Sequence, residues 1–397
     1  MAILSGLAAR GGAFAIGVAL HVFLFRIGEW DLQTTALVAT SAIAQAATII
    51  GVQVLFPREY DAHLHAIMDV GIIAICMTTG TFISMLCYRA FFHRLNRFPG
   101  PFAARLSNIY PTYLSAKRRQ LYEEVQALHR QYGDYVRLGP SELSINDPKA
   151  VAAIHSAQSP CTKGPWYNGL HPMVSIHTIR NKPEHTSRRK VWDRGFSSKA
   201  LRDYEPRVQK YAEQLLGQLD ARVGQSVNVT DWFNFYSFDV MGDLAFGKSF
   251  NMVRDGVKHH FMTSLHRFML DFGLFGHLLW LLPVDTIAAT LTCLFFQLAE
   301  APECLATLQQ EIDDAFNKSD NADSADLWKL PYLDAVINET LRLHPPVPSG
   351  VQRMTPTEGF QIGDTFIPGD CIVQVPTYTM HRGMLSSPAP STGGSRD

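Results

Sequence analysis

Two long uncharged runs near the amino terminus constrain this chain more than any other feature. Residues 32–57 and residues 70–88 contain no Asp, Glu, Lys or Arg. Each run is long enough to cross a bilayer, since a transmembrane helix needs about 20 predominantly apolar residues. A shorter run at residues 11–25 is compatible with a span, a signal-like segment or an interfacial helix, and we expect a span. The sequence therefore predicts a membrane-anchoring region over residues 1–97 with two or three transmembrane helices.

Charge beside these runs predicts their orientation. Arg89, Arg94 and Arg97 follow the last run, and positive clusters of this kind stay on the cytoplasmic side of a membrane. The loop between the second and third runs is richer in acid, with Glu59 and Asp69 among its residues. We therefore expect the rest of the chain to face the cytosol.

Composition excludes some classes of function. The net charge of −1 and the lack of a basic run give no sign of nucleic-acid binding. The six cysteines show no paired spacing, and two of them lie in the last uncharged run. Because the others would occupy a reducing compartment, we expect no disulfides. The 397 residues suffice for one large domain beside the membrane segment.

A helix is predicted over residues 330–343, and two prolines stop it. Its apolar residues recur at three- and four-residue spacing, which indicates one buried face. They are Leu333, Val336, Ile337, Thr340 and Leu341. Glu339 and Arg342 stand three residues apart, where a carboxylate and a guanidinium can pair. A chain of this length should contain about one Glu-x-x-Arg by chance, so a plain surface ion pair is the alternative.

The surroundings of this pair resemble a known family. The helix opens on "LPYLDAVINE", the pair is followed by "LHPPVP", and Arg353 lies eleven residues after Arg342. This combination resembles the K helix and following strand of cytochrome P450 monooxygenases of the fungal microsomal type. The resemblance covers residues 98–382 and implies a mainly α fold with a small β-sheet. It also implies that Glu339 and Arg342 lock the core on the proximal side of the haem.

Other segments resemble the same family in order along the chain. "FPGP" at residues 98–101 is similar to the proline-rich hinge that follows the anchor. A predicted helix ending at Gly133, a hairpin over residues 134–148 and a helix at 148–156 are similar to the A helix, first sheet and B helix. "FDVMGDLAFG" resembles the D to E region, and a helix from Pro302 resembles the J helix. These segments support the fold and carry no chemistry.

Three residues are expected to bind the haem cofactor by this resemblance. Aligning "GFS" on the end of the family's C helix places Arg189 where a basic residue binds a propionate, and His185 where the family often has tryptophan. Arg353 matches a second propionate-binding arginine. A guanidinium suits a carboxylate because its planar fork binds bidentately. The alternatives are a solvated basic helix face for Arg189 and an isolated basic residue in a strand for Arg353.

The resemblance also places a proton relay at Asp285 and Thr286. The family's I helix carries an acid and an alcohol beside the distal face of the haem, and "DT" in "VDTIAATL" falls on this pair. A hydroxyl beside a carboxylate can deliver protons at a fixed position. The alternative is that Asp285 simply caps a helix that begins at Thr286.

Two departures from the family pattern bear on activity. "FGLFGHLLWLLP" runs directly into "VDTIAATL", where the family has a long connection that includes its G and H helices. After Arg382 the chain continues as "GMLSSPAPSTGGSRD", so residues 383–397 are expected to be a disordered tail. No cysteine, Cys371 included, stands in the haem-ligand pattern, and the axial thiolate is what favours O–O cleavage. We therefore expect a truncated, internally deleted chain that is inactive or nearly so.

The resemblance implies haem-dependent insertion of one oxygen atom into an apolar small molecule. Electrons would come from an NADPH-dependent flavoprotein reductase, and the chain would reside in the endoplasmic reticulum membrane. Two other classes stay open at this point. One is a non-catalytic membrane protein with a binding or regulatory role, and the other is a multi-span membrane protein unrelated to the P450 family.

Overall fold

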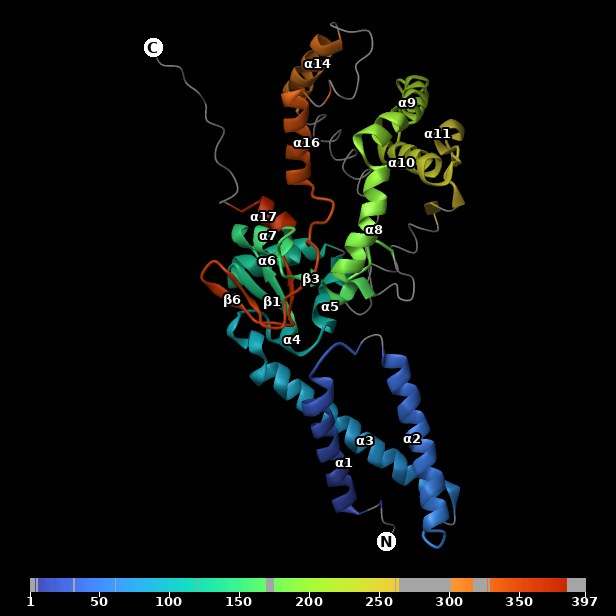
Figure 1. The fold of residues 1–397 in the computed structure, drawn as a ribbon, viewed down its shortest axis with the longest axis vertical. Coiled ribbons are helices and arrows are strands. Elements are labelled where there is room, and N and C mark those ends of the chain that lie inside the picture. The colour runs from blue at the N-terminus through green and yellow to red at the C-terminus, as the bar shows by residue number, and fades with distance from the viewer. Residues whose placement is uncertain are drawn as a thin grey trace. The chain divides into compact units, whose positions relative to one another are not determined.

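A computed structural model of the chain describes residues 4, 6–30, 33–60, 62–118, 120–168, 175–260, 262–263, 301–316, 327 and 329–383. The chain divides into two compact units, and the colour bar of Figure 1 locates each segment. The first unit contains residues 1–107 and 137–141, together with 171–173. The second contains the remainder. Each unit is described by itself.

Three helices of the first unit are long and apolar enough to cross a membrane. They comprise Leu7–Phe25, Ala36–Leu55 and His63–Arg97. The first consists of α1 (Leu7–Leu20) and η1 (His21–Phe25), and the second lies within α2 (Thr34–Leu55). The third consists of α3 (His63–Cys87), η3 (Tyr88–Phe92) and η4 (Arg94–Arg97), after which comes α4 (Phe102–Leu106). These helices contain the three predicted uncharged runs almost completely, although their bounds differ.

Helices α1 and α3 pack closely against each other. A Cβ on Gly17 would lie 1.9 Å from the carbonyl oxygen of Met77, and one on Gly80 would lie 2.2 Å from that of Phe14. The His21 ring and the Ser84 hydroxyl add a hydrogen bond of 2.8 Å. Backbones approach this closely in membranes only where small residues line the contact. Glycine is therefore required at both positions.

A buried arginine holds the segment that follows the third span. The Arg137 side chain is fully buried and donates to the carbonyl oxygens of Gly139 at 3.2 Å and Pro140 at 2.6 Å, and also to the Asn96 side chain. Its backbone N–H donates to the Pro99 carbonyl at 2.8 Å. Since a buried cation is tolerated only with its donors satisfied, this network stabilises the proline-rich linker at residues 98–101.

The second unit begins with helices around a small sheet. The bounds of these first helices are α5 (Ile109–Arg118), α6 (Leu121–Tyr132), α7 (Pro148–His155) and η5 (Pro165–Asn168). Helix α6 ends where Gly133 adopts φ 93°, which confirms the predicted stop. Helix α7 begins after Asp147, whose carboxylate accepts from the Lys149 N–H at 2.9 Å. Such side-chain caps satisfy a backbone donor that has no partner within the helix.

The principal sheet joins strands that are far apart in sequence. Its order is β1 (Tyr135–Gly139), β2 (Glu142–Ile145), β7 (Ile372–Gln374), β4 (Arg353–Met354) and β3 (Thr162–Lys163). Strand β2 runs parallel to β7, whereas β4 is antiparallel to both β7 and β3. A separate hairpin is formed by β5 (Phe360–Ile362) and β6 (Thr365–Ile367). The predicted hairpin of residues 134–148 and the predicted strands after Arg353 are confirmed.

The middle of the second unit is helical. Helix α8 (Lys182–Gly195) has no buried residue, and α9 (Ser198–Asp220), α10 (Val229–Phe246) and α11 (Met252–Asp255) share one core. That core is made by Leu215, Trp232, Phe233, Phe235, Met252, Val253 and Met262. Helix α10 ends at Gly247, whose φ of 70° lies in the left-handed region that favours glycine.

Helices α14 (Pro302–Phe316) and α16 (Pro331–Leu343) form a pair. Leu308 of α14 packs against Leu333 and Val336 of α16. The Glu311 carboxylate accepts from the backbone N–H groups of Tyr332 and Leu333, both at 2.9 Å, and so caps α16 from its neighbour. The predicted helices from Pro302 and over residues 330–343 are therefore confirmed.

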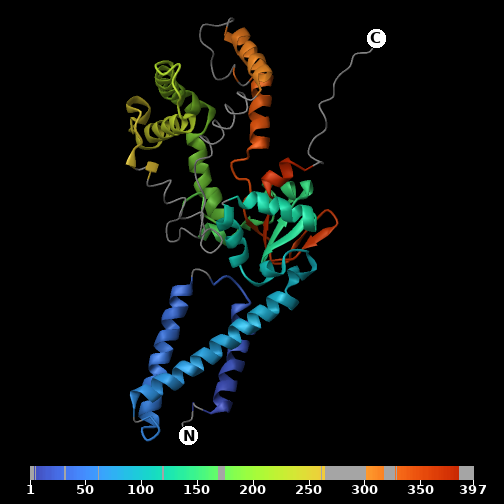
Figure 2. The ribbon, with the colours of Figure 1, turned by 180° about the vertical axis from the view of Figure 1, so that it is seen from behind.

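The prediction of one buried apolar face on α16 is only partly right. Thr340 is the buried residue of this helix, and Ile337 remains 37% exposed. Leu333 and Val336 are covered because α14 contacts the first two turns. A short final helix, α17 (Thr377–His381), follows the sheet and lies near the end of α16, as Figures 1 and 2 both show.

Candidate functional site

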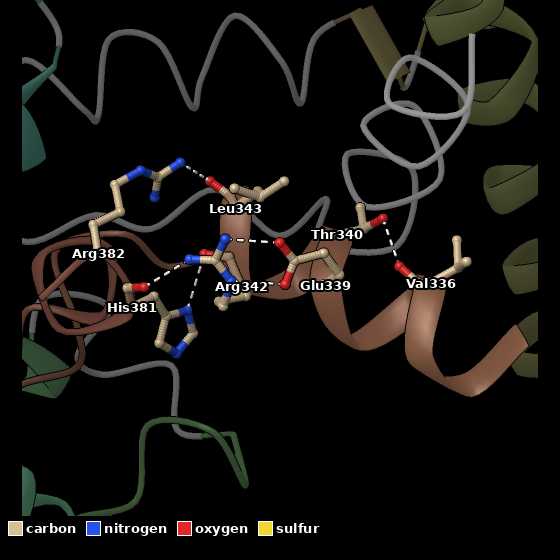
Figure 3. A network of polar contacts seen from close by, with 7 residues as sticks. All are labelled: Val336, Glu339, Thr340, Arg342, Leu343, His381 and Arg382. Carbon is tan, nitrogen blue, oxygen red and sulfur yellow. Dashed lines mark hydrogen bonds and ion pairs between the residues drawn. The ribbon is translucent and has the colours of Figure 1, made fainter. Parts of the chain in front are cut away.

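The Glu339–Arg342 pair forms with the geometry that the sequence predicts. Arg342 Nε donates to Glu339 Oε2 and its Nη2 donates to Oε1, both at 2.7 Å, so the contact is bidentate (Figure 3). The pKa of the Glu339 carboxyl is lowered by this hydrogen bond and by the positive charge of Arg342. The two side chains are 54% and 34% exposed, respectively. Solvent therefore screens the pair, and its Coulomb attraction alone adds little stability.

The same arginine also ties α16 to α17. Arg342 Nη1 donates to the carbonyl oxygen of His381 at 2.9 Å, and the His381 ring nitrogen Nδ1 lies 3.2 Å from the carbonyl oxygen of Arg342. Arg382 donates to the carbonyl of Leu343, as Figure 3 shows. The Arg382 guanidinium also lies 3.8 Å from the centre of the Tyr378 ring. These contacts fix the end of α16, whose last carbonyls have no partner within the helix.

A second cationic site lies where β3 meets β4. The register pairs Lys163 with Arg353. Arg353 Nη1 donates to the hydroxyl of Tyr167 at 3.2 Å, and the Lys163 ammonium donates to the carbonyl oxygens of Ile176 and His177 at 3.1 and 2.7 Å. Two cations on directly paired residues repel each other. We call Lys163, Arg353 and His177 the β3–β4 cluster.

Burial and positive charge lower the pKa values of the titratable groups in and beside this cluster. Burial, followed by the charge of Arg353, lowers the pKa of Lys163 to about 8. Burial and then the charges of Lys163 and Arg353 lower the pKa of His177, and burial with Arg353 lowers that of His155 to about 4. The charges that shift these groups are all positive. A site with this field attracts an anion, whose binding would relieve the repulsion.

The cluster extends to α8 through His185. Burial lowers the pKa of His185, followed by the charges of Lys163 and Arg189. Arg189 lies one helical turn further and is paired with Asp193 at 2.6 Å, with 62% of its side chain exposed. Lys163 and Arg189 are therefore cations that act on His185, whose ring is neutral at pH 7 because its pKa lies below 6.5. Arg189 already has a carboxylate partner.

Lys163 was missed by the sequence analysis. It lies in a two-residue strand between a cysteine and a Gly-Pro turn, and this local pattern carries no strand signal. Its role depends on pairing with Arg353, which follows 190 positions later in the printed sequence. The available clue was an isolated lysine just before a segment rich in Gly, Pro and aromatic residues.

The donor set fits the anionic edge of the implied cofactor. Haem carries two propionates, and Arg353, Lys163 and Tyr167 supply a guanidinium, an ammonium and a hydroxyl in one place. Cys371 is fully buried, and its thiol donates to the carbonyl oxygen of Gly369 at 3.3 Å. Cys161 is also buried, and burial raises the pKa of its thiol.

Two predicted features lie outside the described residues. Asp285 and Thr286, the predicted proton relay, fall within residues 264–300, and the predicted tail of residues 383–397 lies outside the described residues except for Gly383. Within the described part of the chain, no group of three or more His, Cys, Asp or Glu residues is arranged to hold a metal ion.

Comparison with known proteins gives a consistent family assignment. The cytochrome P450 family model matches residues 99–283 and 283–384. The cytochrome P450 monooxygenase FCK2 of Fusarium pseudograminearum is 42% identical over 442 residues, covering 93% of this chain and 80% of the relative. The monooxygenase phqL of Penicillium fellutanum is 35% identical, covering 93% and 77%. The tryprostatin B 6-hydroxylase of Aspergillus fumigatus is 32% identical, covering 92% and 78%.

Proposed function

Because the chain belongs to the cytochrome P450 family, we propose that it is a haem protein of the monooxygenase type whose β3–β4 cluster binds the propionates. The observation that carries this proposal is the close grouping of Lys163 and Arg353 on paired strands. Family membership also excludes the alternative of an unrelated multi-span membrane protein. Haem, when bound, supplies the chemistry that activates dioxygen for insertion of one oxygen atom.

Each named residue has a distinct task in this proposal. Arg353 and Lys163 bind propionate oxygens, Tyr167 holds the Arg353 guanidinium, and Arg189 adds positive charge on α8 beside a neutral His185 that can donate a hydrogen bond. The Glu339–Arg342 pair positions α16 against α17. Asp285 and Thr286 keep their predicted role in moving a proton to the oxygen being reduced.

We also propose that the chain as it stands has little or no monooxygenase activity. Two observations support this. The family match is split at residue 283, where the sequence lacks the expected connection between helices. The alignment with FCK2 spans 442 residues although this chain has 397, so the alignment contains gaps in this chain. Cys371 is fully buried, and its thiol donates to the carbonyl oxygen of Gly369 at 3.3 Å. Loss of the family's connecting segment at the junction after residue 283 would remove much of the cover of the substrate pocket.

A carbon monoxide difference spectrum of the full chain in membranes tests both proposals. Haem content measured on the same sample reports binding, and the position of the Soret band reports the axial ligand. We expect bound haem without the thiolate-type band. A thiolate-type band would refute the inactivity, whereas a chain that takes up no haem at any concentration would refute the propionate site.

The membrane setting and the partners are further parts of the proposal. The three apolar helices support anchoring in the endoplasmic reticulum membrane, with the second unit facing the cytosol, and the family supports an apolar substrate and a membrane-bound NADPH-dependent flavoprotein reductase. Protease added to intact microsomes should digest the second unit. Protection of that unit until detergent is added would contradict the orientation.

A second candidate function is a non-catalytic binding or regulatory role in the membrane. The split family match at residue 283 favours it, because a protein that retains its anchor and cation cluster can bind without completing a reaction. Stable accumulation of the chain in membranes with no haem absorbance would indicate this role.

A further inference from the structure

The first unit contains a polar side chain at the centre of an apolar helix. Gln45 lies midway along α2, which has 22 residues and therefore measures about 33 Å. This length matches the hydrocarbon core of a bilayer, so Gln45 falls near the midplane if α2 spans the membrane. The inference below therefore depends on the membrane anchoring proposed above.

The hydrogen-bonding capacity of Gln45 is only partly used. Its Nε2 donates to the Ser41 hydroxyl of the same helix at 3.2 Å. Among the residues that the structure describes, no donor bonds to its carbonyl oxygen. Nearby hydroxyls on α2 use their own helix, since Thr40 and Thr48 donate to the carbonyls of Ala36 and Ala44, both at 2.7 Å. In hydrocarbon an unsatisfied carboxamide is costly, because no water can replace the missing bonds.

The face around Gln45 is left open by its own chain. Helices α1 and α3 close on each other through Gly17 and Gly80, whereas only 6% of the α2 span is buried. Figures 1 and 2 both show α2 and α3 meeting at their connecting loop and separating away from it. Between them lies a groove of about 550 Å³, with Gln45 on one side and Gly71, Ala74, Thr78 and Phe82 among the residues on the other.

We propose that α2 of a second copy of this chain occupies this groove, with the two Gln45 carboxamides hydrogen-bonded to each other. A carboxamide is both donor and acceptor, so it is complementary to itself across a two-fold axis. Gly71 and Ala74 line the groove with little side-chain bulk, which allows a helix backbone to approach. Each α2 then packs against α3 of the other copy, and both carboxamides are satisfied.

A lipid acyl chain is the competing occupant of the groove. It would fill the apolar volume but leave the Gln45 carbonyl oxygen without a donor. Hydrogen-bonding complementarity therefore favours the second copy, and the two occupants differ in their response to substitution at Gln45.

The test is energy transfer between donor- and acceptor-labelled full-length chains in phosphatidylcholine vesicles, measured over a range of protein-to-lipid ratios. Gln45→Leu should weaken association about 5- to 30-fold, and Gln45→Asn should retain it. Thr40→Val is the matched control, since Thr40 lies in the same span and bonds only within its own helix. Unchanged transfer in Gln45→Leu, or an equal loss in Thr40→Val, would overturn the proposal.

Extraction with alkaline carbonate separates this result from failure of the membrane proposal. If the chain stays in the membrane pellet and Gln45→Leu associates like the unmodified chain, the dimer is refuted and the anchor stands. If carbonate releases the chain, the anchor is refuted, and the dimer proposal falls with it.

Discussion

The two cationic sites of the second unit differ in how their charges are satisfied. Arg342 meets a carboxylate and a backbone carbonyl, and its three bonded nitrogens are all used at 2.7 to 2.9 Å. Lys163 and Arg353 instead face each other on paired strands, and their side chains donate to uncharged carbonyl and hydroxyl oxygens rather than to a carboxylate. The contrast teaches that the role of an arginine depends on what the fold places opposite it.

The largest expected effect concerns Glu142. The β3–β4 cluster lacks a negative counter-charge from this nearby carboxyl only if the carboxyl is neutral. Glu142 is buried on β2 and accepts from the Gln352 amide at 3.2 Å, next to Arg353. Burial raises its pKa from 4.5 to about 7. The side-chain carbonyl oxygen of Gln352 is buried and accepts no hydrogen bond, and the O–H of a protonated Glu142 would offer it a donor.

When folding raises the pKa of a carboxyl group, the neutral group stabilises the fold at pH values below its pKa in the unfolded chain. This stabilisation is lost as the pH rises through its pKa in the folded chain. The unfolding free energy should therefore fall by about 3 kcal/mol between pH 4.5 and pH 7.5. Glu142→Gln should remove this dependence, as thermal unfolding in detergent at several pH values would show. An unchanged pH profile in the variant would mean that Glu142 is ionised and gives the cluster a counter-charge.

Arg342→Ala tests the site where the guanidinium is bound by Glu339 and by the His381 carbonyl. The substitution removes a bidentate pair and the bond to the His381 carbonyl, so we expect a loss of about 2 kcal/mol and a decrease in Tm of roughly 4–8 °C. Arg188→Ala is the matched control, since Arg188 pairs with Glu184 at 2.9 Å on the surface of α8. Its expected cost is below about 1 kcal/mol. Equal shifts in the two variants would show that Arg342 is only another surface pair.

Arg353→Ala tests the β3–β4 cluster, where we expect a change in haem affinity rather than in stability. Removing one of two repelling cations should leave Tm almost unchanged, while haem affinity falls about tenfold through loss of a charge-assisted hydrogen bond. Haem titration of the apoprotein, followed by absorbance, measures the affinity. A large decrease in Tm with unchanged haem affinity would place Arg353 in the same structural class as Arg342.

The pH dependence of haem binding should report Lys163. With its pKa lowered to about 8, the ammonium is charged at pH 7 and is largely neutral at pH 9. Attraction for propionates should therefore weaken severalfold over this range. Lys163→Arg keeps its charge and should flatten the profile, and Lys163→Ala should bind weakly at both values. A profile that is identical in all three chains would exclude Lys163 from the anion site.

The smallest effect is expected at Arg189. Its guanidinium is largely exposed and already paired with Asp193, so Arg189→Ala should change haem affinity less than about threefold. Asp193→Ala releases the arginine and should strengthen binding slightly. A tenfold loss in Arg189→Ala would show that the pair with Asp193 opens when the cofactor binds.

The sequence by itself determined the elements that depend on local pattern. The long uncharged runs, the helix before Pro345 and the Glu339–Arg342 pair followed from hydrophobic period and i,i+3 spacing, because these features act over one or two turns. The motifs around "LHPPVP" and "FDVMGDLAFG" also sufficed to indicate the family that the comparisons then established. Asp285 and Thr286 remain predictions from such a motif.

Only the tertiary structure decided which charges meet. Lys163 lies in a strand of two residues, and its pairing with Arg353 arises because β4 lies between β3 and β7 in the sheet. The contact between Arg342 and the His381 carbonyl, the burial of Glu142 and the groove beside Gln45 likewise join residues that are distant in sequence. A strand or contact of this kind is stabilised by its partner and leaves no periodic signal in its own residues.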